Sequence, residues 1–311
     1  MLNTQLLFFA CFLSYISTKL FIKPLKILSP DIPNKRSAHN KITPRGGGIA
    51  IIISSSICFA ILGQYEFLYL TLLSLTCFLD DIKPINIKYK FSSQLITVFI
   101  LLCNSNIKDN FFQFNNFYLD SIYLIFLIFL GCTVINFSNF IDGIDGLLCS
   151  VMLVILIFSQ TIISSSTLPL IGAIIGFLIW NWSPAKIFLG DVGSNYLGGY
   201  FVYIIFNTNS IIGSLNLILL CSPILFDCTF CIFRRLLNKE NIFQAHSLHL
   251  FQRLVKSGWK HSEVSIIYVF LVSLIGLSWI LGGLKWEIIV SLFTLCCLIF
   301  LDRFYAEKFK V

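Results

Sequence analysis

The chain has 311 residues, of which 57% are hydrophobic and only 12% charged, and its mean hydropathy is +0.87. Soluble domains carry about twice that share of charged residues, so the composition excludes an ordinary soluble domain. The formal charge of +7 does not indicate a nucleic-acid partner, because the cations gather in short loops between apolar segments. We expect an all-α, polytopic integral membrane protein with a single membrane-embedded domain over residues 1–311.

The apolar segments predict about eleven transmembrane helices (ten to eleven), since crossing about 30 Å of hydrocarbon takes roughly 20 apolar residues, or fewer where the bilayer thins. The first segment has no basic stretch before it, so we interpret it as a retained helix and not as a signal peptide. The expected spans are residues 2–22, 47–63, 65–79, 92–104, 118–136, 147–163, 168–182, 193–207, 211–231, 263–282 and 286–301.

Lysine and arginine indicate the orientation of these spans, because they concentrate in cytoplasmic loops. All of them except Lys108 and Lys285 fall in or beside one set of loops or the C-terminus. We therefore expect the N-terminus outside, the C-terminus in the cytoplasm, and cytoplasmic loops near residues 23–46, 80–91, 137–146, 183–192 and 232–262.

The eleven cysteines are scattered through apolar segments and predict no disulfide framework. Cys228 and Cys231 form a C-x-x-C pair. It lacks the second pair or adjacent histidine typical of a zinc motif, so we interpret both cysteines as helix packing.

Five aspartates fall on the predicted cytoplasmic side, and together they indicate one site. In NFIDGIDG, spacings of three place Asn139, Asp142 and Asp145 on one face of any helix that continues through the loop. The other two motifs are FLDDIKP, with Asp80 and Asp81, and IFLGDVGS, where Asp191 suits a Mg²⁺ ligand because that ion prefers oxygen donors. Taken alone, each of the three motifs also fits a solvated turn or a helix cap.

Two basic segments accompany the acids. The first, residues 33–48, carries Lys35, Arg36, Lys41 and Arg45 before three glycines, and it predicts a phosphate cradle of glycine amides and arginine. Affinity for lipid headgroups explains the same charges. The second holds His246, His249 and Arg253 at helical spacing. It suits phosphate contact better than metal binding, although an amphipathic interfacial helix gives the same pattern.

Carboxylates, a hard cation and several basic groups on one membrane face are typical of phosphoryl transfer, in which the protein positions two anions and stabilises the transferring charge. The motifs DIPNKRSAHNKITPRGGG, FLDDIKP, NFIDGIDG, PAKIFLGDVGS and AHSLHLFQRL followed by GWKH occur together, from residue 31 to residue 261. With them the chain resembles the polyprenyl-phosphate N-acetylhexosamine-1-phosphate transferases of glycosyltransferase family 4, of the type that initiates O-antigen or enterobacterial common antigen.

The resemblance implies transfer of a sugar 1-phosphate from a UDP-N-acetylhexosamine to undecaprenyl phosphate, with release of UMP, at the cytoplasmic face of a bacterial inner membrane. It implies Mg²⁺ or Mn²⁺ as cofactor, membrane lipids and the two substrates as partners, and it leaves a homodimer open. By residue, it implies Asn139 and Asp191 as metal ligands, catalytic roles for Asp80, Asp81, Asp142 and Asp145, and substrate binding by Arg45, Lys88, Asn181, His246, His249 and Arg253.

Some alternatives stay open at this point. A related branch of the family acts on UDP-MurNAc-pentapeptide, but its run of three histidines differs from the His246-Ser247-Leu248-His249 of this chain. O-antigen-type relatives usually have arginine where Ser247 stands, which bears on sugar specificity. An ion-coupled transporter would place its acids near the bilayer midplane rather than at one face. For the chemistry, direct attack by the lipid phosphate is preferred over a phospho-aspartate at Asp80 or Asp81.

Overall fold

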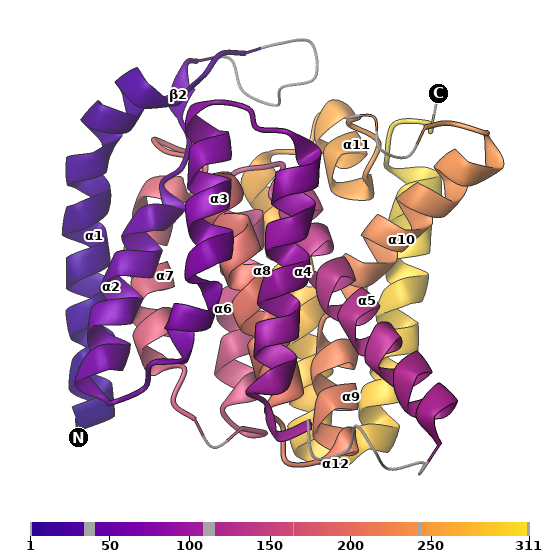
Figure 1. Cartoon of the computed structure of the whole chain (residues 1–311). Helices are drawn as coiled ribbons and strands as arrows, with labels where there is room; N and C mark the ends of the chain where they lie inside the picture. Colours follow the sequence, from indigo (N-terminus) through magenta and orange to yellow (C-terminus); the bar gives the residue numbers. More distant parts are fainter. Residues whose placement is uncertain are drawn as a thin grey trace.

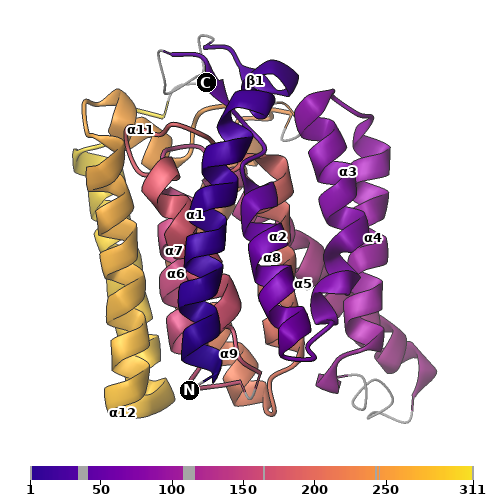
Figure 2. The same ribbon diagram turned by 90° about the vertical axis from the view of Figure 1, so that its left-hand side faces the viewer.

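The structure, a computed structural model, describes residues 2–33, 41–107, 116–163, 165–241, 244 and 246–309. It is a bundle of helices in which the start of the first helix and the end of the last lie at opposite ends (Figures 1 and 2). The all-α class is confirmed, apart from one pair of two-residue strands. In chain order the elements are α1 (Leu2–Leu28), β1 (Pro30–Asp31), β2 (Thr43–Pro44), α2 (Gly48–Ile61), the 3₁₀ helix η1 (Glu66–Leu70), α3 (Thr71–Ile82), α4 (Ile87–Cys103), α5 (Phe117–Ile141), α6 (Leu147–Ser159), α7 (Leu168–Asn181), α8 (Gly190–Phe206), α9 (Ile211–Leu220), α10 (Ser222–Leu237), α11 (Leu250–Lys256) and α12 (His261–Phe304).

The first eight predicted spans match α1 to α8 in order, and the remaining three differ in form. The ninth span is broken, because α9 and α10 meet at 67° and Pro223, at the start of α10, has no N–H to continue α9. The last two spans are the halves of α12, which is interrupted at Gly283 (φ 68°, ψ −166°).

The interruption at Gly283 reverses the direction of α12. A straight helix of 44 residues would be about 66 Å long. Yet His261 at its start contacts Asp145, and Asp302 near its end contacts Arg253, at the same end of the bundle. A positive φ is strained for residues with a side chain, so glycine suits the reversal.

By length and composition, α1, α5 and α12 could each cross a membrane, and α9 with α10 is a fourth if the bent pair is one span. Helices α2, α6 and α7 are apolar but shorter. The protein is thus a multi-pass membrane protein, while the total of about eleven spans stays a prediction.

Helix α8 lies inside the bundle, packed by α2, α3, α4 and α5, and every residue from Val192 to Phe206 is buried. Because it meets protein rather than lipid, α8 can carry polar groups along its length. Asn195, for example, accepts a hydrogen bond from Gln94 of α4 (3.0 Å) and donates one to the backbone of Asp191 (2.8 Å). These bonds hold the first turn of α8 in a fixed orientation.

Helices α1 and α7 approach closely at two glycines. A Cβ on Gly172 would lie 2.1 Å from the carbonyl oxygen of Leu7, and one on Gly176 would lie 2.1 Å from that of Cys11. The spacing is the small-x-x-x-small pattern that lets membrane helices pack backbone to backbone.

We expect Gly176→Ala to lower the melting temperature by several degrees, because the new methyl group meets backbone that cannot move aside without separating α1 from α7. Thermal unfolding in detergent measures the change. Ile179→Ala, at an exposed position of the same helix, serves as the control and should have a much smaller effect. Equal melting temperatures for Gly176→Ala and the parent would contradict the close approach.

The loops between α3 and α4, α5 and α6, and α7 and α8 lie at the same end of the bundle as α11 (top of Figure 1). All five aspartates singled out in the sequence belong to these loops or the adjoining helix ends. The helix arrangement therefore positions one candidate site at this end.

Candidate active site

A cavity of about 210 Å³ opens among these loops. Four of the five aspartates line it, and the fifth, Asp80, is linked to Asp191 through Lys90. The ionisable groups in the wall of the cavity are Asp31, Arg45, Asp81, Asp142, Asp145, Asp191 and His261.

Asp81 caps helix α8. Its two carboxylate oxygens accept the backbone N–H groups of Asp191 and Val192, each at 3.0 Å, and the residue is only 2% exposed. Carboxylates are stabilised at helix N-termini by the unpaired amides there. Asp81 therefore positions Asp191, which stands in the first turn of α8.

Asp80 points away from its neighbour and toward Lys90 of α4. One Asp80 oxygen accepts the N–H of Ile85 (2.9 Å), and the other accepts from the Lys90 ammonium (3.2 Å). The same ammonium contacts the Asp191 carboxylate, so one cation joins α3, α4 and α8. The predicted set did not include Lys90; it included Lys88, whose side chain is exposed. Two positions along a helix turn a side chain by about 200°, so only one of the two lysines can face the acids.

Asn139, at the end of α5, lies beside Asp191. Its amide nitrogen donates to an Asp191 oxygen (3.0 Å) and to the hydroxyl of Ser194 (2.9 Å). The two residues predicted to hold a metal are thus in direct contact, although they are 52 positions apart in the chain.

The loop after α5 differs from the expected continuous helix. Helix α5 ends at Ile141, and residues 142–146 form turns in which Gly146 has a φ of 73°. The prediction that Asn139, Asp142 and Asp145 share one helical face is therefore wrong, because the glycines end the helix. The turns nevertheless carry both aspartates into the wall of the cavity.

The two aspartates of this loop have opposite environments. Burial, followed by the charges of Asp191, Asp81 and Asp145, raises the pKa of Asp142 well above its usual range. Burial would also raise the pKa of Asp145, but His261 and the backbone N–H of Ala185 outweigh it and hold that pKa below its usual value.

These shifts predict opposite effects of Asp142→Asn and Asp145→Asn on stability at pH 7.5. A carboxyl group whose pKa is raised on folding destabilises the fold once the pH exceeds its unfolded pKa of about 4, so removing Asp142 should raise the melting temperature. Asp145 stabilises the fold above that pH, and the effect is lost as the pH falls through its lowered folded pKa. Removing Asp145 should therefore lower the melting temperature, by about 2 °C or more.

Thermal unfolding without substrate at pH 7.5 and pH 4.5 measures both changes. The gain from Asp142→Asn should shrink toward pH 4.5, because that pH is close to the unfolded pKa of the carboxyl group and the penalty of its raised folded pKa is lost there. Shifts of the same sign for the two variants would contradict this assignment.

Arg45 and the glycines after it lie beside Asp81 and the loop before α8. The guanidinium donates to the Asp81 carbonyl (3.3 Å) and lies 3.7 Å from the Asp81 carboxylate, with 37% of its side chain exposed. The amides of Gly47 and Gly48, however, donate to Phe188 and Leu189.

The amides of Gly47 and Gly48 are therefore committed to the loop before α8 and are not available to a phosphate, contrary to that part of the predicted cradle. The glycines serve close packing instead, since a Cβ on Gly48 would lie 2.2 Å from the Cα of Gly193. Arg45 stays at the cavity, whereas Lys41 is exposed and Lys35 and Arg36 lie outside the described residues.

Asn181, at the end of α7, also lines the cavity. It is 4% exposed and donates to the carbonyl of Ile187 (3.0 Å), so it holds the loop that leads into α8. Asp145 holds the same loop by accepting the N–H of Ala185 (3.1 Å).

The histidine segment does not line the cavity. His249 is 4% exposed, and its ring lies near Phe140, Phe251 and His246. Arg253 is 3% exposed and contacts Asp302 and the carbonyls of Leu248 and Glu307, so its geometry supports a structural role.

Asp227 of α10 caps helix α11. It accepts the N–H groups of Leu250 (2.7 Å) and Phe251 (3.2 Å) and the hydroxyl of Tyr268 (2.6 Å). Ser247 accepts from the ammonium of Lys256 at 2.8 Å, so a cation stands beside the position where arginine was expected.

Sequence reasoning missed Lys90 and His261 as residues of this site. His261 begins α12 and lies 3.3 Å from both the backbone nitrogen and the carboxylate of Asp145. The GWKH motif was visible before the tenth span, but a histidine next to a lysine at a membrane boundary also fits a solvated loop. Only the fold brings it to Asp145, 116 positions earlier in the chain.

The helical bundle and the acid-lined cavity at one end define a membrane-embedded enzyme of the phosphate-transferring kind. The sequence pattern of glycosyl transferase family 4 matches residues 64–209. A "Probable undecaprenyl-phosphate N-acetylglucosaminyl 1-phosphate transferase" from Bacillus subtilis (strain 168) is 32% identical over 85% of this chain and 81% of its own length. The chain therefore belongs to glycosyl transferase family 4.

Two other relatives cover most of the chain. An undecaprenyl-phosphate alpha-N-acetylglucosaminyl 1-phosphate transferase from Thermotoga maritima is 29% identical over 86% of both chains. A phospho-N-acetylmuramoyl-pentapeptide-transferase from Clostridium beijerinckii is 28% identical over 73% of this chain and 78% of its own length. The chain is thus similar to both branches of the family along most of its length.

Proposed function

We propose that this enzyme transfers N-acetylhexosamine 1-phosphate from a UDP-N-acetylhexosamine to undecaprenyl phosphate, releases UMP, and so initiates a lipid-linked envelope glycan of the O-antigen type. The observation that carries the proposal is the Asp80–Lys90–Asp191 cluster with Asn139 at the mouth of a membrane-embedded bundle. We also propose that this mouth faces the cytoplasm of a bacterial inner membrane, where a sugar nucleotide is available.

The choice of an N-acetylhexosamine donor rests on two relatives that cover 85% and 86% of the chain. Similarity to the B. subtilis protein reaches 32% over 85% of the chain. Several pentapeptide transferases are more identical, such as that of Renibacterium salmoninarum at 40%, but over only 36% of the chain. UDP-MurNAc-pentapeptide is therefore the second candidate donor.

The residues fit a divalent cation such as Mg²⁺, or Mn²⁺. Carboxylate oxygens outnumber cationic groups around the cavity, and hard cations prefer such oxygen donors. Asp191 and the amide oxygen of Asn139 would hold the ion, which would neutralise charge on the donor diphosphate when bound. Removal of divalent metal by a chelator should abolish turnover, and added Mg²⁺ should restore it.

The protein's own residues would bind and orient the two anions. Arg45, in the wall of the cavity, and Lys90, which contacts the Asp191 carboxylate beside it, would present positive charge to the phosphates. An oxygen of the lipid phosphate would attack the phosphorus next to the sugar, and the bond from that phosphorus to the UMP oxygen would break. Since a phosphate monoester is mostly dianionic at pH 7, the attack needs no strong general base.

The contacts of the acidic pair favour this direct attack over a phospho-aspartate. Both oxygens of Asp81 accept backbone N–H groups, and both oxygens of Asp80 are bonded to Ile85 and Lys90. A nucleophile would have to give up these bonds. Labelled sugar phosphate trapped on the protein without lipid would overturn the direct route.

The experiment combines purified protein, undecaprenyl phosphate and Mg²⁺ with labelled UDP-GlcNAc, UDP-GalNAc or UDP-MurNAc-pentapeptide. We expect a lipid-linked sugar and UMP in equal amounts from an N-acetylhexosamine donor. Product from the pentapeptide donor alone would move the chain to the peptidoglycan branch. No product from any donor, with folded protein, would contradict the proposal.

A further inference from the structure

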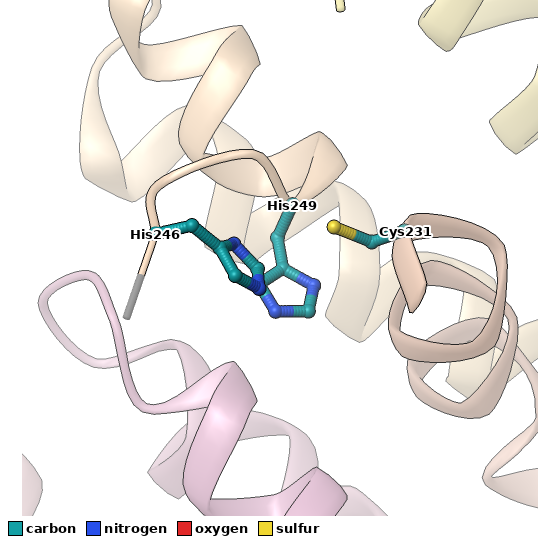
Figure 3. A group of neighbouring side chains, drawn as sticks. All are labelled: Cys231, His246 and His249. Carbon is teal, nitrogen blue, oxygen red and sulfur yellow. The ribbon is translucent and has the colours of Figure 1, made fainter. Parts of the chain in front are cut away.

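A second group of ligand-type side chains lies apart from the acid-lined cavity, where α10 meets the segment before α11. Cys231 comes from α10, and His246 and His249 come from that segment (Figure 3). One ligand atom from each of the three residues lies within 4.8 Å of the other two. None of the three lines the cavity.

The group is inside the protein, and it contains an unpaired nitrogen. Cys231 is 3% exposed and His249 is 4% exposed, while His246 is half-buried. Within the described residues, Nδ1 of His249 has no hydrogen bond, and its nearest acceptor, an Asp227 oxygen, is 3.5 Å away. Buried polar atoms almost always have a hydrogen-bond partner or a ligand, so a partner is expected here.

The chemistry of the three side chains selects the partner. A thiolate with two imidazoles prefers Zn²⁺ or another borderline-soft ion, whereas Mg²⁺ prefers the oxygen donors of the main cavity. The imidazole of His249 also lies beside the carboxylate of Asp227. Asp227 is itself fixed by the amides of Leu250 and Phe251 and by Tyr268.

We propose that Cys231, His246 and His249 bind a zinc ion that fastens the segment before α11 to α10. Three protein ligands leave a fourth coordination position for water. Helix α11 carries Phe251, and a Cβ on Gly143 of the cavity loop would lie 2.8 Å from that ring. The zinc therefore stabilises a helix that packs against the aspartate-bearing loop, without taking part in the transfer reaction.

The C-x-x-C pair of the sequence divides between two environments. The thiol of Cys228 lies 3.8 Å from the Phe137 carbonyl, in the helix packing, whereas that of Cys231 lies beside the two histidines. Cys228 thus provides a matched control, since it is a buried cysteine in the same helix, three positions from the proposed ligand.

The test uses full-length, metal-stripped protein in nanodiscs, titrated with Co²⁺ as a spectroscopic probe and then with Zn²⁺. Because metal binding releases any proton on the histidines, the titration is made at pH 8. With excess Mg²⁺ present to occupy the acid-lined cavity, we expect one thiolate-bound Co²⁺ per chain, seen as a thiolate-to-cobalt absorption band, and its displacement by Zn²⁺. Cys231→Ser should remove the band and weaken binding by at least about 100-fold, and His246→Ala by at least about tenfold.

Cys228→Ser should bind as the parent does, and melting temperatures establish that each variant is folded. His246→Ala is the second variant because its half-buried loop position tolerates truncation better than the helix core. Absence of Co²⁺ binding by the folded parent would overturn the proposal. So would a thiolate band that survives Cys231→Ser, or one that is lost equally in Cys228→Ser. No readout depends on transferase activity.

Discussion

Replacing Asp191 by asparagine is expected to lower the rate of UMP release by at least about 100-fold, comparable to loss of a major electrostatic group in other active sites. The substitution keeps the size of the side chain and removes the charge that attracts the Lys90 ammonium and the proposed divalent cation. The assay measures UMP from an N-acetylhexosamine donor and undecaprenyl phosphate at saturating Mg²⁺.

The melting temperature shows whether the variant is folded. We expect it to fold, because Asn139 can still donate a hydrogen bond to an amide oxygen at position 191. Asp191→Glu keeps the charge but moves it by one methylene group, so its activity should lie between those of Asp191→Asn and the parent. Full activity in folded Asp191→Asn would remove Asp191 from the site.

Lys90→Met is expected to reduce turnover by at least about tenfold, because charge-assisted contacts to a transferring phosphate are among the strongest that a side chain can make. It also leaves Asp80 and Asp191 facing each other without the cation between them. The same assay measures the loss, and melting temperatures separate it from unfolding.

Lys88→Met is the matched comparison, since it removes an equal charge two positions earlier on the same helix. Lys88 is exposed, so we expect its activity to stay within about twofold of the parent. A greater loss for Lys88→Met than for Lys90→Met would restore the role that sequence reasoning gave to Lys88.

The helices were predictable because apolar runs long enough to cross a bilayer can form little else. The broken spans were harder to predict. Pro223 begins α10 and Gly283 divides α12, but proline and glycine are also tolerated inside membrane helices. Neighbouring helices decide whether such a residue kinks, breaks or reverses a helix.

The acids of the site were found from their one-sided distribution, while their individual roles were not. Asp80 and Asp81 are adjacent in sequence, yet one faces Lys90 and the other caps α8. Similarly, the three glycines after Arg45 suggested phosphate binding, whereas Gly47 and Gly48 are used for backbone pairing and close packing. Residue type indicates what a group can bind, but several partners satisfy it equally well.

Composition, the length of the apolar segments and charge distribution determined by themselves that this is an all-α membrane protein with its acids on one side, because each segment that crosses the bilayer must be apolar and must satisfy its own backbone hydrogen bonds. The tertiary structure alone decided which side chains meet. It joined Lys90 to Asp191, His261 to Asp145, and Cys231 to two histidines. Such contacts depend on the rotation and depth of each helix, which are set by packing against its neighbours and leave no local signal in the chain.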